Sequence, residues 1–174
     1  MTAPLLLRLH ARDRALMLRC VIAPSAPRRA RLTWSAITHL GGTSTSILAA
    51  AVPWLGCCDW HEGSRVALAT LVGSHLVVQV IKRTVGRARP SALETAIALV
   101  HEPDRFSFPS GHAAAAMSVA LGYGSAFPLA AAPLVALALV VGFSRVRLGV
   151  HFPGDVVVGQ LISLGTLATI LLVS

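Results

Sequence analysis

Residues 106–144 read FSFPSGHAAAAMSVALGYGSAFPLAAAPLVALALVVGFS and carry no formal charge at pH 7 apart from whatever charge His112 holds. Such a stretch is typical of a membrane-embedded segment, because an ionised side chain at the bilayer centre costs about 2.5 to 3.5 kcal/mol. It is too long for one span, which needs about 20 residues. Residues 122–128, GYGSAFP, are rich in turn formers, so the sequence predicts two helices joined by a short hairpin.

Three further uncharged stretches flank this segment, at residues 32–58, 66–81 and 156–174. We expect a first span over about 34–56 and a last span over 156–174. Residues 66–81 would rise only about 24 Å, short of a hydrocarbon core of about 30 Å, so that helix should continue through Arg65 or Lys82. The sequence therefore predicts an all-α integral membrane protein, with a bundle of about five transmembrane helices in a single domain over 32–174.

The first 31 residues have a different character, with seven Arg against one acidic residue, Asp13. Leucines and Cys20 recur there at helical spacing, while the arginines fall on another face. We expect residues 1–31 to form a basic arm whose amphipathic helix lies in the membrane interface. A partly disordered basic tail is the alternative for residues 22–31.

Composition excludes a soluble enzyme and a disordered chain. The 174 residues are 55% hydrophobic and only 13% charged, with a mean hydropathy of +0.71. A soluble domain is usually about 25% charged. The net charge is +8, but the basic residues sit between apolar runs rather than on one face, so we expect no nucleic-acid partner.

The distribution of charge predicts the topology. The N-terminal arm carries seven Arg and one Asp, whereas the loop 59–65 carries one Arg against two acidic residues. Positive charge favours the cytoplasmic side, so the N-terminus is predicted to be cytoplasmic and the loop 59–65 external. The loops 82–105 and 145–155 then face each other on the cytoplasmic surface.

Three polar segments on that surface carry the predicted chemistry: KRTVGRARP at 82–90, FPSGH at 108–112 and SRVRLGVHFPGD at 144–155. Lys82, Arg89 and Arg145 would supply three cations to one pocket, as a phosphate dianion requires. Ser110 and Gly111, at a predicted helix start, would add a hydroxyl group and backbone N–H groups.

Two histidines would lie beside that phosphate. His151 precedes Asp155 by four residues, so the carboxylate can orient one ring nitrogen and raise the basicity of the other, which suits a nucleophile. His112 has no carboxylate at that spacing and suits a general acid that protonates the leaving oxygen.

These segments resemble the type 2 phosphatidic acid phosphatase superfamily, the lipid phosphate phosphatases that share a pocket with vanadium haloperoxidases. Its motifs, Lys-x6-Arg-Pro, Pro-Ser-Gly-His and Ser-Arg-x5-His-x3-Asp, are all matched in full. The resemblance implies a small bacterial protein of the inner membrane whose nucleophile forms a phosphohistidine, without a metal or another cofactor. The residues it implies are His151, Asp155 and His112 for catalysis, and Lys82, Arg89, Ser110, Gly111 and Arg145 for phosphate.

The expected function is hydrolysis of a terminal phosphate from a lipid in the bilayer. Candidate substrates are phosphatidic acid, phosphatidylglycerophosphate, a polyprenyl diphosphate and a polyprenyl-linked sugar phosphate. Two alternatives stay open: a catalytically inactive protein that binds anionic lipid, and a vanadate-dependent peroxidase.

Four further polar residues, which are not among the predicted site residues, also carry expectations. Arg87 should meet lipid phosphates at the surface, and Arg147 should lie near the substrate headgroup. His75 is expected to be a hydrogen-bonded packing residue within its span. Asp104 should either gate the pocket or form local ion pairs in a solvated loop.

Overall fold

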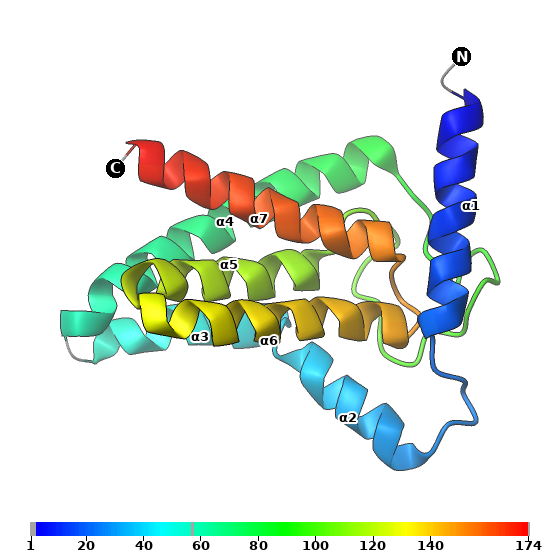
Figure 1. Cartoon of the computed structure of the whole chain (residues 1–174), viewed down its shortest axis with the longest axis horizontal. Coiled ribbons are helices and arrows are strands. Elements are labelled where there is room, and N and C mark those ends of the chain that lie inside the picture. Colours follow the sequence, from blue (N-terminus) through cyan, green and yellow to red (C-terminus); the bar gives the residue numbers. More distant parts are fainter. Residues whose placement is uncertain (1–2, 57, 174) are drawn as a thin grey trace.

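The computed structural model describes residues 3–56 and 58–173 as a helical bundle with a transverse N-terminal helix (Figure 1). Within those residues there are seven α-helices, two short 3-10 helices and no β-strand. They are α1 (Ala3–Cys20), α2 (Arg28–His39), α3 (Thr43–Ala51), η1 (Val52–Leu55), η2 (Cys58–Trp60), α4 (His61–Val85), α5 (Gly111–Ala126), α6 (Pro128–Arg147) and α7 (Pro153–Val173).

Three helices, α4, α6 and α7, are long and apolar enough to cross a membrane, and Thr43–Leu55 forms a shorter apolar helix. The predicted all-helical membrane fold is confirmed. The helix predicted around 66–81 continues through both Arg65 and Lys82, and the stretch 106–144 divides into α5 and α6 at Phe127.

The single helix expected over 34–56 is wrong, because the chain turns between α2 and α3. Gly41 lies in that turn against the backbone of α5, and a Cβ atom there would be 2.7 Å from both the His112 carbonyl oxygen and Val141. Only glycine permits so close an approach, so packing against α5 sets the bend. As a result, α2 diverges from the bundle while α3 runs along it (Figure 1).

Helix α5 is the centre of the bundle and packs against α4, α6 and α7. Its sequence is rich in small residues, which allow close contact between membrane helices. A Cβ atom on Gly122 would overlap the backbone of Ala67 in α4. The hydroxyl of Ser118 also bonds Ser74 of α4 at 2.8 Å and Ser163 of α7 at 3.0 Å, so three helices share one buried polar link.

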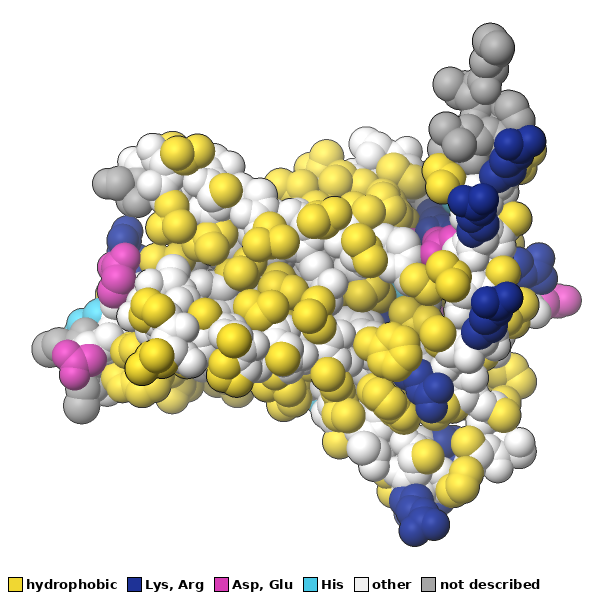
Figure 2. Space-filling model, viewed as in Figure 1, with side chains coloured by type: hydrophobic (Ala, Val, Ile, Leu, Met, Phe, Trp, Pro, Cys, Tyr) yellow, Lys and Arg dark blue, Asp and Glu magenta, His cyan; other side chains and the backbone are white. Residues whose placement is uncertain are grey.

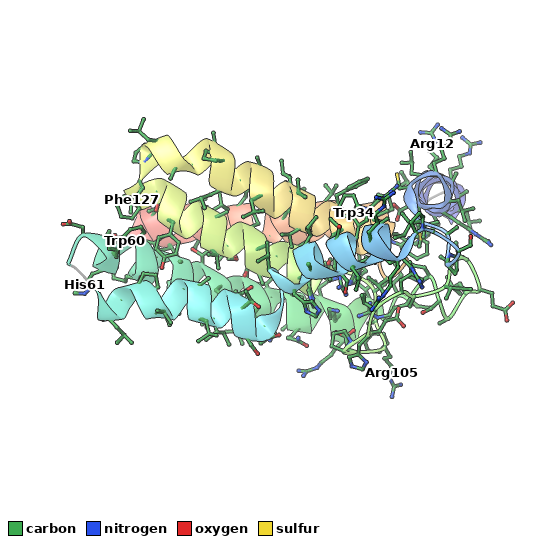
Figure 3. The ribbon with its side chains drawn as sticks, turned by 90° about the horizontal axis from the view of Figure 1, so that it is seen from below. Arg12, Trp34, Trp60, His61, Arg105 and Phe127 are labelled. Atoms are coloured by element: carbon green, nitrogen blue, oxygen red, sulfur yellow. The ribbon has the colours of Figure 1, made fainter. Side chains whose placement is uncertain are left out.

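The surface is consistent with a membrane on the long face of the bundle. Hydrophobic side chains cover that face, whereas Lys and Arg gather at the end where α1 and α2 lie (Figure 2). Aromatic side chains mark both ends: Trp34 lies near α1, and Trp60 lies at the opposite end with Phe127, 4.8 Å between ring centroids (Figure 3). Tryptophan and tyrosine favour membrane–water interfaces.

Candidate functional site

The three motif segments meet at the end of the bundle near α1, where α4 and α6 end and α5 and α7 begin (Figure 1). Gly86 ends α4 in the left-handed conformation, with φ 62°. That conformation is easily accessible only to glycine and lets the chain reverse over the site. The loop that follows is held by bonds between its two ends, from Ser107 N to Arg87 O at 2.9 Å and from the Ser107 hydroxyl to Ala88 O at 3.1 Å.

Lys82 and Arg89 both bind the carboxylate of Asp104. The Lys82 Nζ donates to the two carboxylate oxygens at 2.9 and 3.1 Å, and Arg89 Nη2 donates to Oδ1 at 3.1 Å. Burial opposes ionisation of Asp104, but the bonds and charges of Lys82 and Arg89 outweigh it and hold the carboxyl pKa below its ordinary value. An internal carboxylate therefore occupies the two cations that the sequence assigned to phosphate. Asp104 does form ion pairs, but with these two site residues at the cavity rather than within a solvated loop.

His151 lies beside the same cations, at the end of a turn between α6 and α7. Its Nε2 is 3.4 Å from Arg89 Nη1 and its Nδ1 is 3.5 Å from Asp155 Oδ2. Burial and the charges of Arg145 and Arg89 lower the pKa of His151 to about 4, although Asp155 acts in the opposite direction. The imidazole is therefore neutral at pH 7 and keeps a lone pair on one ring nitrogen.

Arg145 is almost fully buried and incompletely paired. Its Nη1 donates to Thr38 Oγ1 of α2 at 2.8 Å, whereas Nε and Nη2 have no hydrogen-bond partner among the described residues. Unsatisfied N–H groups in a buried guanidinium are costly, so they are commonly matched by a bound anion or water. The contribution of Thr38 could not be read from the sequence, because α2 reaches the site only through tertiary packing.

The start of α5 lies against the start of α7. Ser110 caps α5 and donates its backbone N–H to Asp155 O at 2.9 Å, while its side chain accepts the N–H of Ala113 at 3.5 Å. A Cβ atom on Gly111 would meet nothing within 4 Å, so open space lies beside the first N–H groups of α5. Such a helix start favours an anion.

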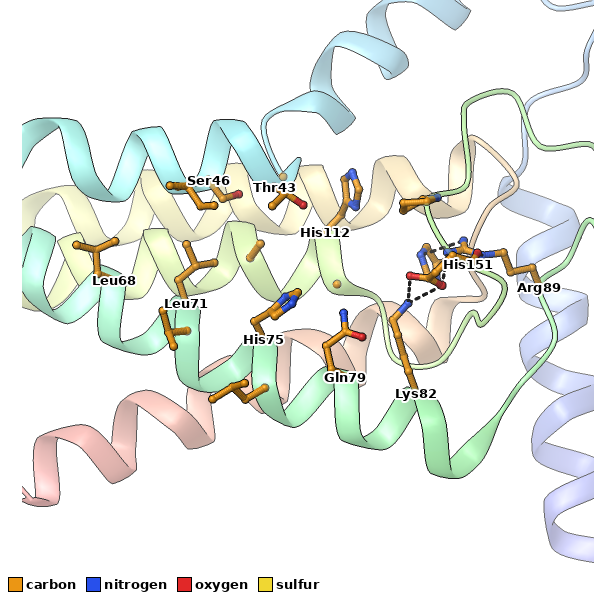
Figure 4. A pocket seen from close by; sticks show the side chains of 18 residues that line it. Thr43, Ser46, Leu68, Leu71, His75, Gln79, Lys82, Arg89, His112 and His151 are labelled. Atoms are coloured by element: carbon orange, nitrogen blue, oxygen red, sulfur yellow. Dashed lines mark hydrogen bonds and ion pairs between the residues drawn. The ribbon is translucent and has the colours of Figure 1, made fainter.

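A cavity of about 580 Å³ joins these groups (Figure 4). Five of the eight predicted site residues line it: Lys82, Arg89, Gly111, His112 and His151. The other three, Ser110, Arg145 and Asp155, are buried behind this wall. From Lys82 the cavity follows α4 past Gln79 and His75 to Leu68, with α3 on its opposite side.

Arg87 lies beside the site, and the prediction that it meets lipid phosphates at the surface is wrong. It does not face lipid: its Nη1 donates to Asp155 Oδ1 at 2.6 Å and its Nη2 to Asp13 Oδ2 of α1 at 2.8 Å. Asp13 Oδ1 also accepts the N–H of Gly154, at the start of α7, at 2.8 Å. One guanidinium thus links the carboxylate beside His151 to the N-terminal helix. The signal available in the sequence was Asp13 itself, the sole acid in an arginine-rich arm.

The prediction that Arg147 lies near the substrate headgroup is also wrong. Its Nη1 donates to the Cys20 carbonyl oxygen at 2.8 Å, and its guanidinium lies over the Trp34 ring at 5.2 Å from the centroid. It holds α1 and α2 against α6 rather than facing the cavity. Among residues 3–56 and 58–173, no group of three His, Cys, Asp or Glu side chains is arranged to hold a metal ion.

Replacing Asp13 with asparagine should speed hydrogen exchange at the start of α7 about tenfold or more. The change weakens the contacts of Asp13 with Arg87 Nη2 and with the Gly154 N–H. Each such charge-assisted contact is worth roughly 1.5 to 3 kcal/mol, and a loss of about 1.4 kcal/mol raises the exchange rate tenfold. Mass spectrometry of a peptide covering residues 150–158, in detergent, measures the effect. The exposed neighbour Arg14→Gln is the control, and equal exchange in both variants would contradict the link.

Family comparison supports the same part of the chain. The model of the PAP2 superfamily matches residues 64–174, a segment that contains Lys82, Arg89, His112, His151 and Asp155. The chain belongs to the PAP2 superfamily.

Individual PAP2 relatives agree with this assignment. The chain is 39% identical over 131 residues to decaprenylphosphoryl-5-phosphoribose phosphatase of Mycolicibacterium smegmatis, covering 71% of this chain and 68% of that protein. It is 44% identical over 96 residues to the protein of the same name from Mycobacterium tuberculosis, covering 54% of this chain and 51% of the relative. The chain thus spans about half the length of that relative.

A solved PAP2 structure shares the fold. The crystal structure of a transmembrane PAP2-type phosphatidylglycerolphosphate phosphatase from Bacillus subtilis superposes with a TM-score of 0.75 at 28% identity, covering 94% of this chain and 84% of that one. The likeness extends over nearly the whole chain, including residues that precede the matched family segment, and it supports an integral membrane protein.

Proposed function

We propose that this PAP2 protein is a membrane phosphatase that removes a terminal phosphate from a lipid. The observation that carries the proposal is the cavity of Figure 4, which places neutral His151 among buried cations at one end and apolar side chains of α4 at the other. The cationic end suits a phosphate dianion, and the apolar end suits a lipid chain. The names of the related proteins, which are phosphatases of prenyl and glycerol lipids, support the same class.

In the proposed first step, the lone pair of His151 Nε2 attacks phosphorus and the bond from phosphorus to the lipid oxygen breaks. Asp155 keeps the proton on Nδ1, so Nε2 is the free nitrogen. His112, in its protonated form, gives its proton to the departing oxygen, and the dephosphorylated lipid leaves. Arg145, Lys82 and Arg89 stabilise the charge on the three phosphoryl oxygens, together with the N–H groups at Gly111.

In the second step, His112 takes a proton from water as the water oxygen attacks the phosphohistidine. The P–N bond breaks, its electron pair returns to Nε2, and inorganic phosphate is released. Every group in the cycle belongs to this chain, and the scheme uses no metal. The substrate phosphate must first displace the Asp104 carboxylate from Lys82 and Arg89, so Asp104 acts as a built-in competitor.

The orientation in the membrane is part of the proposal. Helices α4 to α7, with α3 and η1 as a shorter fifth element, would cross the bilayer of a bacterial inner membrane, and the site would face the cytoplasm. Helix α1 would lie in the interface, as its position across the end of the bundle and its exposed leucines support (Figures 1 and 2). The division into an arm, 1–31, and a phosphatase domain, 32–174, stays a prediction.

Phosphate release by the detergent-purified chain in EDTA tests the function. We expect turnover of at least one of four lipids: phosphatidic acid, phosphatidylglycerophosphate, a prenyl diphosphate and a prenylphosphoryl 5-phosphoribose. Turnover should persist in EDTA and stop with orthovanadate, which mimics the transition state of phosphoryl transfer. Loss of turnover in EDTA would contradict the metal-free scheme. Bromide oxidation with vanadate and peroxide would favour the vanadate-dependent peroxidase. Lipid binding without turnover would favour the catalytically inactive lipid-binding protein.

A further inference from the structure

The Asp155 carboxylate is held from two sides. Its Oδ2 lies 3.5 Å from His151 Nδ1 and accepts the backbone N–H of Phe152 at 2.9 Å. Its Oδ1 accepts Nη1 of Arg87 at 2.6 Å. Each carboxylate oxygen therefore has its own partner, and Arg87 fixes the rotation of the group that brings Oδ2 to the histidine. The Asp155 side chain is fully buried, so bulk water cannot replace the guanidinium.

Arg87 is placed to act on Asp155 rather than on the substrate. It does not line the cavity, unlike His75 of α4, which lines it and is exposed there, so that the packing role expected for His75 is wrong. Only 13% of the Arg87 side chain is exposed, and its second arm, Nη2, is bound by Asp13 at 2.8 Å. Because carboxylates engage both arms of the fork, the geometry suits holding Asp155 in place better than binding phosphate.

Helix α1 supplies the outer end of this contact, where it crosses the end of the bundle (Figure 1). Asp13 and Met17 lie one turn apart on the same face of α1. Asp13 Oδ1 accepts the N–H of Gly154 at 2.8 Å, and Met17 is fully buried in one cluster with Phe152. Both of these partners lie within three residues of Asp155. Helix α1 therefore packs against the segment that carries the catalytic carboxylate.

We propose that Arg87 is a positioning residue of this site and that Asp13 of α1 holds it in place. The inference rests on the proposed function and adds to it two residues that do not touch the substrate. Arg87 keeps Oδ2 of Asp155 directed at His151 Nδ1, so the proton stays on Nδ1 and the lone pair on Nε2 faces phosphorus. The N-terminal arm, which precedes the matched family segment, is thereby part of the working site.

The test compares kcat and KM of the purified chain, Arg87→Met and Arg87→Lys, on whichever of the four lipids named above the unchanged chain hydrolyses fastest. Arg87→Met should lower kcat about 10- to 100-fold with little change in KM, because misplacing a catalytic group by about 1 Å can cost 10²-fold. Arg87→Lys keeps the charge but not the two-armed fork, so it should recover only part of the loss. An unchanged kcat in Arg87→Met would overturn the inference and leave the proposed function intact.

A double-mutant cycle tests the part assigned to Asp13. Asp13→Asn should lower kcat about 3- to 10-fold in the unchanged chain but not in Arg87→Met, because its effect on catalysis passes through Arg87. Equal losses in the two backgrounds would show that Asp13 acts independently of Arg87 and would overturn its part in the inference.

Arg147→Met is the matched control, because Arg147 also anchors α1, through the Cys20 carbonyl oxygen at 2.8 Å, but its contacts lie on Cys20 and Trp34. Both Arg147→Met and Arg87→Met should lower Tm in detergent, whereas only Arg87→Met should lower kcat. An equal fall in kcat in the two variants would show that loosening α1 is enough, and would overturn the positioning role of Arg87.

The tautomer of His151 is a readout that a purely structural role would not move. At pH 7 the NMR shifts of its ring nitrogens, assigned by their loss in His151→Ala, should report a proton on Nδ1 in the unchanged chain and a mixture of tautomers in Arg87→Met. The same tautomer in both chains would overturn the inference even if kcat falls. No turnover of any lipid by the unchanged chain would overturn the proposed function and the inference together.

Discussion

Replacing His151 with alanine should abolish phosphate release, lowering kcat by at least about 10⁴-fold, the order of loss seen when a catalytic nucleophile is removed. In the proposed cycle His151 is the group that attacks phosphorus: its Nε2 lies 3.4 Å from Arg89 Nη1, and its pKa is lowered to about 4, so that it is neutral at pH 7. Water could still attack the bound phosphate, but without the covalent intermediate.

The fold should survive the His151 change. Its Nδ1 has no hydrogen bond among the described residues and lies 3.5 Å from Asp155 Oδ2, and its Nε2 lies 3.4 Å from Arg89 Nη1, so the variant loses two long contacts. His10→Ala, on the exposed face of α1, is the control and should retain full turnover. A brief reaction of the unchanged protein with a labelled substrate, quenched in alkali, should trap an acid-labile phosphoryl group that the His151 variant lacks. Turnover near the unchanged level in His151→Ala would rule out the proposed nucleophile.

Replacing Arg145 with methionine should separate activity from stability. We expect kcat/KM to fall by about 10²-fold or more, because Nε and Nη2 of this buried guanidinium have no hydrogen-bond partner among the described residues and, in the proposed cycle, stabilise the phosphoryl charge. The Tm of the protein without substrate should stay the same or rise by a few degrees. An incompletely paired buried cation costs more in desolvation than its one bond to Thr38 returns, and methionine fills a similar volume.

Arg147→Met is the matched control for this experiment. It lies on the same helix two residues away, but its guanidinium bonds the Cys20 carbonyl and lies over Trp34. Its replacement should lower Tm with little change in kcat/KM, the opposite pattern. If Arg145→Met and Arg147→Met behave alike, Arg145 has a structural role and the proposed phosphate contact is wrong. With orthovanadate bound, the Tm of the unchanged chain should become higher than the Tm of Arg145→Met.

Much of the helical architecture could be predicted because it depends on local properties. The absence of charge over residues 106–144 favours membrane burial, and GYGSAFP at 122–128 breaks the helix within one turn of the observed boundary at Phe127. The bend at Gly41 could not be predicted. It depends on the distance between this residue and the His112 carbonyl, and that distance exists only after the turn between α2 and α3 has packed against α5.

The candidate site divides in the same way. Motif spacing indicated that Lys82, Arg89, Gly111, His112 and His151 belong together, and the cavity does contain all five. The partners of these residues were missed or only partly foreseen. Arg87 was expected at the lipid surface and instead bridges Asp155 and Asp13, and Asp104 occupies Lys82 and Arg89. Motif spacing reports which residues share a function, but it does not report how their charges are balanced.

The sequence by itself predicted a membrane-embedded helical bundle with a phosphate-binding site at one end. Hydropathy and the identity of the motif residues are properties of the chain before it folds, because the bilayer rejects charge wherever the chain places it. Tertiary structure alone decided which carboxylate each cation meets, and that Nε and Nη2 of buried Arg145 have no hydrogen-bond partner among the described residues. These features depend on contacts between residues such as Asp13 and Gly154, which lie far apart in the chain and meet only when α1 crosses the start of α7.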